Sequence, residues 1–290
     1  MGGRLRVSGM RSSDMEAEAP VLIIEAGSSP LGKQLSELWD YRELLYFLAW
    51  KDFKVRYKRT ILGVAWAIIQ PFFTMVIFSI FFGYLGKIPS DGIPYPVFAY
   101  CALLPWSLFA HALAESSNSL INNQSLITKV YFPRLIIPIA PLFVGLVDFG
   151  VACVLLIGMM LFYGIAPGVA VFTVPLFVLL AVITALTVGL WLSALNVQYR
   201  DFRYTIPFLT QLWLFATPVA YPSSLLPEPW RTLYGLNPMA GVVEGFRWAL
   251  LGQTSEPGAL VAVSIGVVIM LLIGGLWYFT RMEQTFADIV

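Results

Sequence analysis

Three ionisable side chains stand inside otherwise apolar stretches of the sequence, where they could take part in proton transfer. His111 and Glu115 lie four residues apart, so a helix would place them on one face, and Asp148 is the only carboxylate in the next apolar stretch. Ionisable groups within a membrane are costly and typically functional, and a chain of them can relay protons. The structural alternative places His111 and Glu115 close to a membrane surface and pairs Asp148 with another helix.

The rest of the sequence has no pattern typical of an enzyme or a metal site. It contains one histidine, two cysteines in apolar segments and no Ser-His-Asp arrangement that the expected helices would bring together. The segment "GSSPLGKQ" (27–34) nearly matches a phosphate-binding loop, but Gln34 replaces the hydroxyl residue that would hold Mg²⁺. Only about 25 residues separate it from the first apolar run, too few for a nucleotide-binding domain. We therefore expect no metal, ATPase or catalytic site in this chain.

The composition is that of a membrane protein. Hydrophobic residues make up 58% of the 290 residues and charged residues 12%, whereas soluble domains have about 25% charged residues. Uncharged runs cover residues 61–86, 149–199, 204–227 and 257–280, and about 20 apolar residues suffice for a helix to cross a bilayer. The sequence predicts an all-α polytopic membrane protein.

Six membrane-spanning helices are expected, at residues 61–85, 96–117, 135–163, 169–195, 204–221 and 258–280. The uncharged run 149–199 is too long for one crossing, and the turn residues of "GIAPG" (164–168) divide it into a helical hairpin. The second helix is interrupted by Pro105, His111 and Glu115, and the fifth is short. Five or seven crossings therefore remain alternatives.

The distribution of basic residues predicts the orientation. Residues 1–60 hold ten of the 18 lysines and arginines, and the loops 118–134 and 196–203 hold four more. Loops rich in Lys and Arg stay in the cytoplasm. We expect both termini and these two loops on the cytoplasmic side of the membrane.

The segment 43–59 has an aromatic and basic pattern directly before the first apolar run. Tyr46, Trp50, Phe53 and Tyr57 fall within about 60° of one another on a helix. Lysines and arginines flank this stripe, as in helices that lie in the membrane interface. A plain basic flank that fixes the orientation of the first crossing is the alternative, but a flank needs no aromatic stripe.

The segment 222–257 predicts two short helices on the outer side of the membrane. The first begins near Pro229 and stops at Gly235, and the second has Asn237 as its N-cap, Pro238 as its first residue and Gly252 as its stop. About 14 residues reach roughly 20 Å, which is short of a crossing. We expect a re-entrant or interfacial helix pair, and an ordinary amphipathic surface helix is the alternative.

Several motifs together resemble the permease subunit of ABC-2 type polysaccharide exporters. "ELWDYRELLYFLAWKDFKVRYKRTILGVAWAIIQP" (37–71) is the most specific of them, and "YFPRLIIP", "NVQYRDF" and "LNPM" follow in the family's order and spacing. The resemblance covers the chain from about residue 35. It implies a cytoplasmic segment 1–60 with an interface helix and an ABC-2 transmembrane domain at 61–290.

The resemblance also implies roles for individual residues. The helix at 43–59 would be a gate or interface helix that touches the ATPase and the lipid headgroups, with the residues Trp50, Phe53, Lys54, Arg56, Tyr57, Lys58 and Arg59. The first inner loop would dock into the ATPase through Leu120, Ile121, Asn122, Gln124, Leu126, Lys129 and Tyr131. The first and fifth crossings would line the path with Trp66, Gln70, Phe73, Phe208, Gln211, Leu212 and Phe215. The outer helices would form a gate with Trp230, Tyr234, Asn237, Phe246 and Trp248.

The implied assembly is a homodimer in the inner membrane that works with two copies of a separate ABC ATPase, which binds ATP and Mg²⁺. Its expected substrate is a lipid-linked polysaccharide, with O-antigen as the first candidate, and no nucleic-acid partner is expected. Teichoic acid, capsule or a drug is an alternative cargo. A membrane enzyme acting on lipid-linked sugars and a non-transport scaffold are alternatives from other classes. The lack of converging acidic residues argues against the enzyme.

Overall fold

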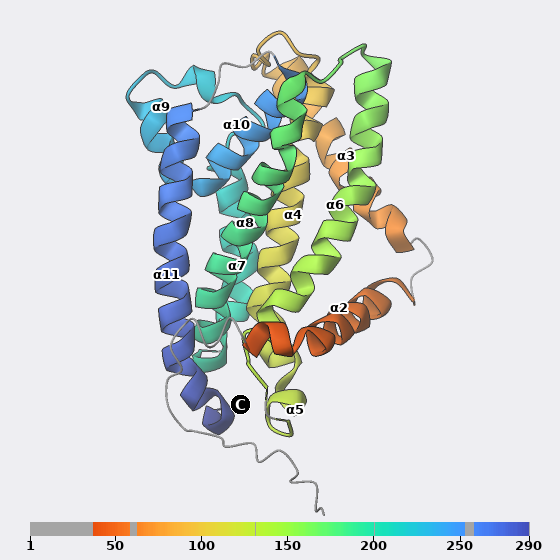
Figure 1. Ribbon diagram of the computed structural model, residues 1–290. Helices are drawn as coiled ribbons and strands as arrows, with labels where there is room; N and C mark the ends of the chain where they lie inside the picture. Colours follow the sequence, from red (N-terminus) through yellow and green to blue (C-terminus); the bar gives the residue numbers. More distant parts are fainter. Residues whose placement is uncertain (1–36, 59–62, 131, 200, 253–257, 290) are drawn as a thin grey trace, which may run out of the picture.

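The computed structural model describes residues 37–58, 63–130, 132–199, 201–252 and 258–289. These residues form helices and connecting loops, without a β-strand among them. The helices, arranged as in Figure 1, are α2 (Arg42–Tyr57), α3 (Trp66–Phe78), α4 (Tyr95–Asn122), α5 (Gln124–Ile127), α6 (Ile136–Phe162), α7 (Val174–Gln198), α8 (Phe202–Phe215), α9 (Trp230–Leu233), α10 (Pro238–Leu251) and α11 (Gly258–Ile289). The expected all-helical fold is confirmed.

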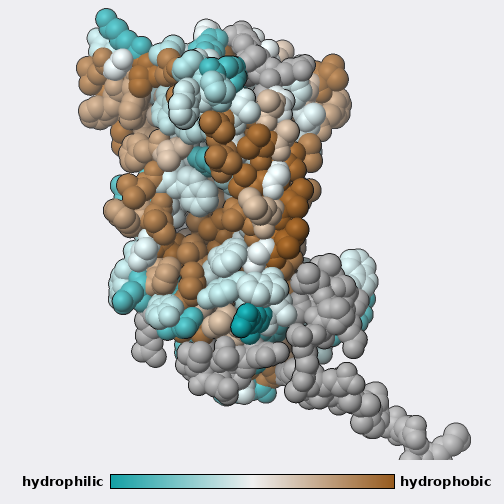
Figure 2. All heavy atoms as spheres, turned by 90° about the vertical axis from the view of Figure 1, so that its left-hand side faces the viewer, coloured by the Kyte–Doolittle hydropathy of each residue, from teal (hydrophilic) through white to brown (hydrophobic). Residues whose placement is uncertain are grey.

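Five helical segments of the described chain are long and apolar enough to cross a membrane: Gly63–Leu85, Tyr95–Asn122, Ile136–Phe162, Val169–Gln198 and Gly258–Glu283. They correspond to the first, second, third, fourth and sixth expected crossings. Figure 2 shows a hydrophobic band across the middle of the molecule, with more hydrophilic side chains at both ends. The chain is therefore a multi-pass membrane protein.

The fifth expected crossing is shorter than its apolar sequence suggests. Helix α8 has 14 residues and ends at Phe215, about 21 Å from its start. The carbonyl groups of Pro218, Val219 and Tyr221 accept hydrogen bonds from a buried arginine, Arg247, instead of from helical amides. The expected helix 204–221 is thus replaced by a turn after residue 215, and a sixth crossing stays a prediction.

Helix α4 lies at the centre of the bundle. It packs against α3, α6, α7, α8 and α10, and most of its length is buried. Pro105 does not end it, and the helix continues through His111 and Glu115. Neighbouring protein surrounds much of α4, and within this helix His111 is half-buried whereas Glu115 is exposed.

The predicted break between the third and fourth crossings is confirmed. Helix α6 ends at Phe162, and Gly164 adopts a positive φ of 67°, a backbone conformation that glycine adopts without strain. A short 3₁₀ turn, Val169–Thr173, then leads into α7. The two helices pack against each other as well as against α4.

Helix α2 crosses one end of the bundle instead of running along it, and it packs mainly on α6 (Figure 1). Leu48 faces the bundle and is buried, whereas Tyr46 and Trp50 are exposed. The predicted aromatic stripe forms a continuous series of ring contacts along α2, from Tyr46 through Trp50 and Phe53 to Tyr57. Helix α5 lies at the same end of the molecule, which we call the α5 end.

The two short helices in 222–257 lie at the opposite end, which we call the α9 end (Figure 1). Helix α9 follows Pro229, and α10 has Asn237 as its N-cap and Gly252 as its left-handed C-cap, as the sequence predicted. Every residue of α10 except Trp248 is buried, because α4, α7 and α11 surround the helix. This burial excludes the ordinary surface helix, and the re-entrant arrangement stays a prediction.

Candidate functional site

A cluster of charged side chains joins the last turn of α2 to the bundle. One Nη atom of Arg56 lies 2.6 Å from Asp148 Oδ2 of α6, and the other donates to the ring of His111 in α4 at 2.9 Å. The Tyr57 hydroxyl donates a hydrogen bond to Asp148 Oδ1. Helices α2, α4 and α6, which are distant in sequence, therefore meet around the ion pair of Arg56 and Asp148. We call this cluster of Arg56, Tyr57, His111 and Asp148 the α2 junction.

The α2 junction gives two of the ionisable residues of α4 and α6, His111 and Asp148, a contact with Arg56. Asp148 pairs with another helix, as the structural alternative predicted, and its partner is Arg56. His111 contacts the same guanidinium group, while Glu115 borders a neighbouring cavity. An ion pair with Tyr57 and His111 beside it satisfies charges that would be costly in hydrocarbon. The ion pair therefore accounts for Asp148 and His111 without a proton relay.

Two cavities adjoin the α2 junction, and Arg56 and His111 line both of them. The first, of about 380 Å³, lies between α3, α4 and α6, and we call it the inner cavity. The second, of about 550 Å³, lies between α2, α4 and α6 toward the α5 end. A rearrangement of the Arg56 side chain would change the wall that separates the two spaces.

A direct hydrogen bond ties α2 to the loop that was expected to contact an ATPase. Lys51 Nζ donates to Asn123 Oδ1 at 2.7 Å, and Asn123 is the residue between α4 and α5. Lys51 also lies 3.4 Å from Asp52. A displacement of the α5 loop would therefore act on α2 without an intermediate element.

The expected coupling residues divide by position. Leu120, Ile121 and Asn122 belong to the last turn of α4 and not to a loop, and Leu120 is fully buried. Gln124 and Lys129 are exposed at the α5 end, and Leu126 is half-buried. Tyr131 lies outside the described residues. Asn122, Gln124 and Lys129 are the members of this set that are accessible to a soluble partner.

The expected gate-helix residues have different surroundings. Trp50 and Phe53 stack on each other, and Lys54 lies over the Trp50 ring at 5.4 Å from its centroid. Lys58 is exposed, whereas Arg56 and Tyr57 contact Asp148 in the α2 junction. Arg59 lies outside the described residues. The basic residues of α2 therefore do not act as one uniform surface, since Arg56 is committed to an internal ion pair.

The residues expected to line a path are all exposed in the isolated chain. They lie on α3 and α8, which pack against α4 from different positions: Trp66, Gln70, Phe73, Phe208, Gln211, Leu212 and Phe215. Trp66 and Gln70 also border the inner cavity. The structure thus places them on an open surface, which lipid or a second copy could cover.

At the α9 end, Asn237 connects α10 to the end of α8. Its Oδ1 accepts from Trp213 Nε1 at 2.8 Å and from the Met239 amide, and its Nδ2 donates to the Ala216 carbonyl. The Tyr234 hydroxyl hydrogen-bonds that of Tyr221 at 2.8 Å. Burial raises the pKa of Tyr234 above its usual range, and this hydrogen bond adds to the rise, so the hydroxyl stays protonated.

The other expected outer-gate residues are dispersed. Phe246 is buried and contacts the ring of Phe149, while Trp230 is largely exposed on α9 and Trp248 is half-buried. The structure therefore does not bring the five expected gate residues into one cluster.

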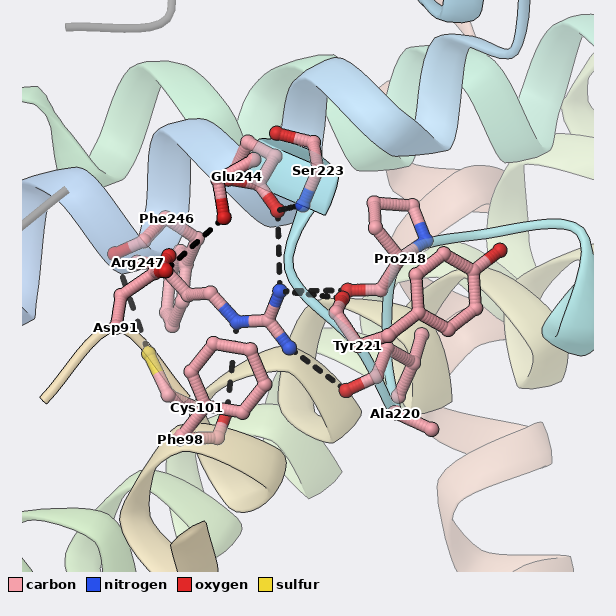
Figure 3. A network of polar contacts seen from close by, with 12 residues as sticks. Asp91, Phe98, Cys101, Pro218, Ala220, Tyr221, Ser223, Glu244, Phe246 and Arg247 are labelled. Carbon is pink, nitrogen blue, oxygen red and sulfur yellow. Dashed lines mark hydrogen bonds and ion pairs between the residues drawn. The ribbon is translucent and has the colours of Figure 1, made fainter. Parts of the chain in front are cut away.

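The most extensively bonded side chain near them is Arg247, which the sequence analysis did not single out for a role (Figure 3). Its guanidinium group is fully buried and donates to the carbonyls of Pro218 and Val219, each at 2.6 Å. Its Nη1 atom lies 3.1 Å from Glu244 Oε1, and its Cζ atom lies 3.6 Å from the centroid of the Phe98 ring of α4. Burial lowers the pKa of Arg247, and the adjacent Glu244 counters that effect. The sequence signal was an i, i+3 Glu–Arg pair within an apolar helix.

We expect the α2 junction to contribute measurably to stability. Replacing Asp148 with asparagine leaves Arg56 without its carboxylate partner and should lower the free energy of unfolding by about 1–3 kcal/mol. The double variant Arg56→Gln, Asp148→Asn should lose less than the sum of the two single changes, because neither charge remains alone. Thermal unfolding of the purified protein in detergent measures this, with Lys58→Gln as the control. Additive losses would contradict a direct ion pair.

The Arg247 network should be more sensitive to substitution. Arg247→Met leaves the buried Glu244 carboxylate unpaired and several carbonyls without their donor, which should cost about 3–5 kcal/mol. The exposed Lys129→Met makes the same change of charge at the other end and should leave the melting temperature nearly unchanged. If the two variants melted alike in the same detergent, the network would not be a stabilising element.

Comparison with known proteins places these features in a family. The family model described as ABC-2 type transporter matches residues 43–251, from α2 through α10. An O-antigen export system permease protein from Myxococcus xanthus is 30% identical over 253 residues, which cover 86% of this chain and 96% of that protein. A protein of the same description from Klebsiella pneumoniae is 28% identical, with coverage of 86% and 95%. A polysialic acid transport protein from Escherichia coli is 25% identical over 80% of this chain and 91% of its own length. The chain belongs to the ABC-2 type transporter family of membrane proteins.

Proposed function

We propose that this chain is the channel-forming subunit of an ATP-driven exporter that moves lipid-linked polysaccharide from the cytoplasmic to the outer face of the inner membrane. O-antigen is the proposed cargo. The observation that carries this proposal is the similarity to O-antigen export permeases over 86% of the chain and nearly the whole of those proteins. Capsular polysaccharide is the second candidate, because the polysialic acid transport proteins match as well, at lower identity.

The proposed topology has six crossings, with α8 and the turn after it as the fifth. In this arrangement the α5 end and both termini face the cytoplasm, because the basic residues concentrate there. Helix α2 lies in the inner membrane interface, with its ring series against lipid and its lysines toward the headgroups. The helices α9 and α10 form the re-entrant outer segment.

The proposed assembly contains two copies of this chain and two copies of a separate ABC ATPase that binds ATP and Mg²⁺. Membership of the ABC-2 family supports the ATPase partner. The open surface of α3 and α8 supports the second copy, since large side chains such as Phe73, Phe208 and Leu212 are more than half exposed there. A glycan would pass between the two copies along these helices.

The coupling mechanism follows from the contacts at the α5 end. Closure of the ATPase on ATP would displace α5, and Asn123 would transmit the displacement to α2 through Lys51. Helix α2 would in turn act on α6 and α4 through the α2 junction. A conformational change of this kind requires ATP-bound partners to interact differently with the two arrangements, and the proposed contact of the ATPase with α5 would be the place where that difference arises.

Replacing Lys51 should separate ATP hydrolysis from export. Lys51→Met removes the hydrogen bond to Asn123 but keeps most of the side-chain volume, so we expect export to fall by about fivefold while the ATPase continues to turn over. Lys87→Met, at an exposed position between α3 and α4 and outside both α2 and the α5 end, provides the matched control. Export is measured as the glycan transported, and ATP hydrolysis as the phosphate released, by the complex in vesicles. The coupling ratio is the first quantity divided by the second. Equal coupling ratios in the two variants would rule out the proposed link.

Deletion of the gene tests the function itself. The expected result is loss of the surface glycan ladder together with accumulation of lipid-linked polymer in the inner-membrane fraction. The ladder could instead be lost without trapped polymer. If that result persists in cells with an intact biosynthetic operon, it would indicate that the chain is an enzyme of glycan synthesis. An unchanged surface ladder, including the capsule, would exclude polysaccharide export. Complementation with the intact gene controls for effects on neighbouring genes.

A further inference from the structure

The inner cavity has a lining that is unusual for the interior of a membrane protein. It lies between α3, α4 and α6 and is partly open, and its volume of about 380 Å³ lies within the range of about 300–1,000 Å³ that is typical of small-molecule sites. Polar side chains and aromatic rings share its wall: Arg56, Trp66, Gln70, Thr74, Trp106, Ser107, His111, Asp148 and Phe149. Such a mixture is costly to maintain beside hydrocarbon and indicates a ligand or water.

Two of the polar groups in this wall have no hydrogen-bond partner among the described residues. These are the side-chain amide of Gln70 on α3, which is exposed, and the hydroxyl of Ser107 on α4, which is half-buried, and both residues border the cavity. The neighbouring Thr74 hydroxyl differs, because it donates to the Gln70 carbonyl at 2.9 Å. An amide and a hydroxyl left open in this way can both donate and accept hydrogen bonds, which suits a ligand with hydroxyl groups.

The charges of the cavity favour a neutral ligand. Arg56 and Asp148 are paired at 2.6 Å, so the cation and the anion of the wall compensate each other. His111 is already engaged by the guanidinium group of Arg56. A phosphate group would have to displace Asp148 to gain Arg56, and a second cation does not line this cavity within the described chain. The charge balance therefore argues against an anionic headgroup.

The aromatic residues give the cavity flat apolar surfaces next to its open polar groups. The Trp66 ring is about half exposed on α3, and Trp106 contributes a buried ring from α4. A pyranose ring has C–H faces that pack on an aromatic surface and hydroxyl groups at its rim. Lipid chains lack such hydroxyl groups and would leave Gln70 and Ser107 unsatisfied.

We propose that the inner cavity is a binding site for one sugar ring of the transported glycan, within a single subunit and beside the path between copies. The ring lies against Trp66, and its hydroxyl groups bond Gln70 and Ser107, while the α2 junction closes the end toward α2. This inference rests on the proposed export function. It adds a place where the glycan is held inside one subunit.

Photo-crosslinking in cells tests the site with the host's own lipid-linked glycan as the probe. The photoreactive residue p-benzoylphenylalanine replaces Gln70 or Ser107, and Leu161 provides the control because it is exposed on α6 and does not line the cavity. We expect ultraviolet light to attach a lectin-positive glycan ladder to the protein at 70 and 107 and not at 161. Lipid adducts alone at all three positions, in cells that still export glycan, would overturn the sugar site and leave the export function intact.

Conservative substitutions provide a second measurement that avoids a bulky side chain. Gln70→Leu and Ser107→Ala should each lower the rate of glycan export about fivefold at equal protein level, as expected for the loss of one ligand hydrogen bond. Ser79→Ala is the control, because its hydroxyl donates to the Met75 carbonyl and lies outside the cavity. Export at the control rate in both cavity variants would mean that the cavity holds only water. Unchanged surface glycan after gene deletion would instead refute the export function itself.

Discussion

A polar side chain within hydrocarbon needs protein around it or a polar partner, and this constraint underlies the arrangement of the whole bundle. Helix α4 satisfies this constraint by its position, since five other helices pack against it and Pro105 is buried. Asp148 satisfies this constraint by pairing with Arg56, and Glu244 satisfies it by pairing with Arg247. Arg56 comes from α2 at the α5 end, whereas Glu244 and Arg247 both belong to α10, and Arg247 also reaches Phe98 of α4. Satisfying buried charge is therefore also what attaches the end segments to the spanning helices.

The two attachments differ in the number of bonds that they contain. At the α9 end, Arg247 holds the turn after α8 through several carbonyls and stacks on Phe98, and Asn237 bridges the same turn to α10. At the α5 end, the polar contacts of α2 with the bundle include those of Arg56 and Tyr57 with Asp148 and that of Lys51 with Asn123, beside the apolar packing of Leu48. Few polar bonds, partly exposed, are easier to exchange than a fully buried network. This asymmetry agrees with a mobile α2 and a firmly fixed outer segment.

Local features of the fold could be predicted from the sequence, whereas contacts between distant helices could not. The Asn237 cap, the Gly252 stop and the break at 164–168 depend on a few adjacent residues, and all three are present in the structure. The end of α8 at Phe215 was not predicted, because the competitor for its carbonyls is an arginine 29 residues beyond Pro218. The α2 junction joins residues 56 and 148, whose proximity depends on how α2 crosses α6. The roles of the path and gate residues stay predictions.

The central position of α4 limits which parts of the molecule can move. A helix in contact with α3, α6, α7, α8 and α10 cannot shift without disturbing several packed interfaces at once. Helices α2, α3 and α8 have open faces and fewer neighbours. The subunit is thus divided into an inner frame of α4, α6, α7, α10 and α11 and a periphery of α2, α3 and α8 that can tilt against it. Opening by outward tilt of the peripheral helices would leave the frame packed, and its cost would lie in the core contacts of Met75 and Phe78 on α3 and of Leu48 on α2.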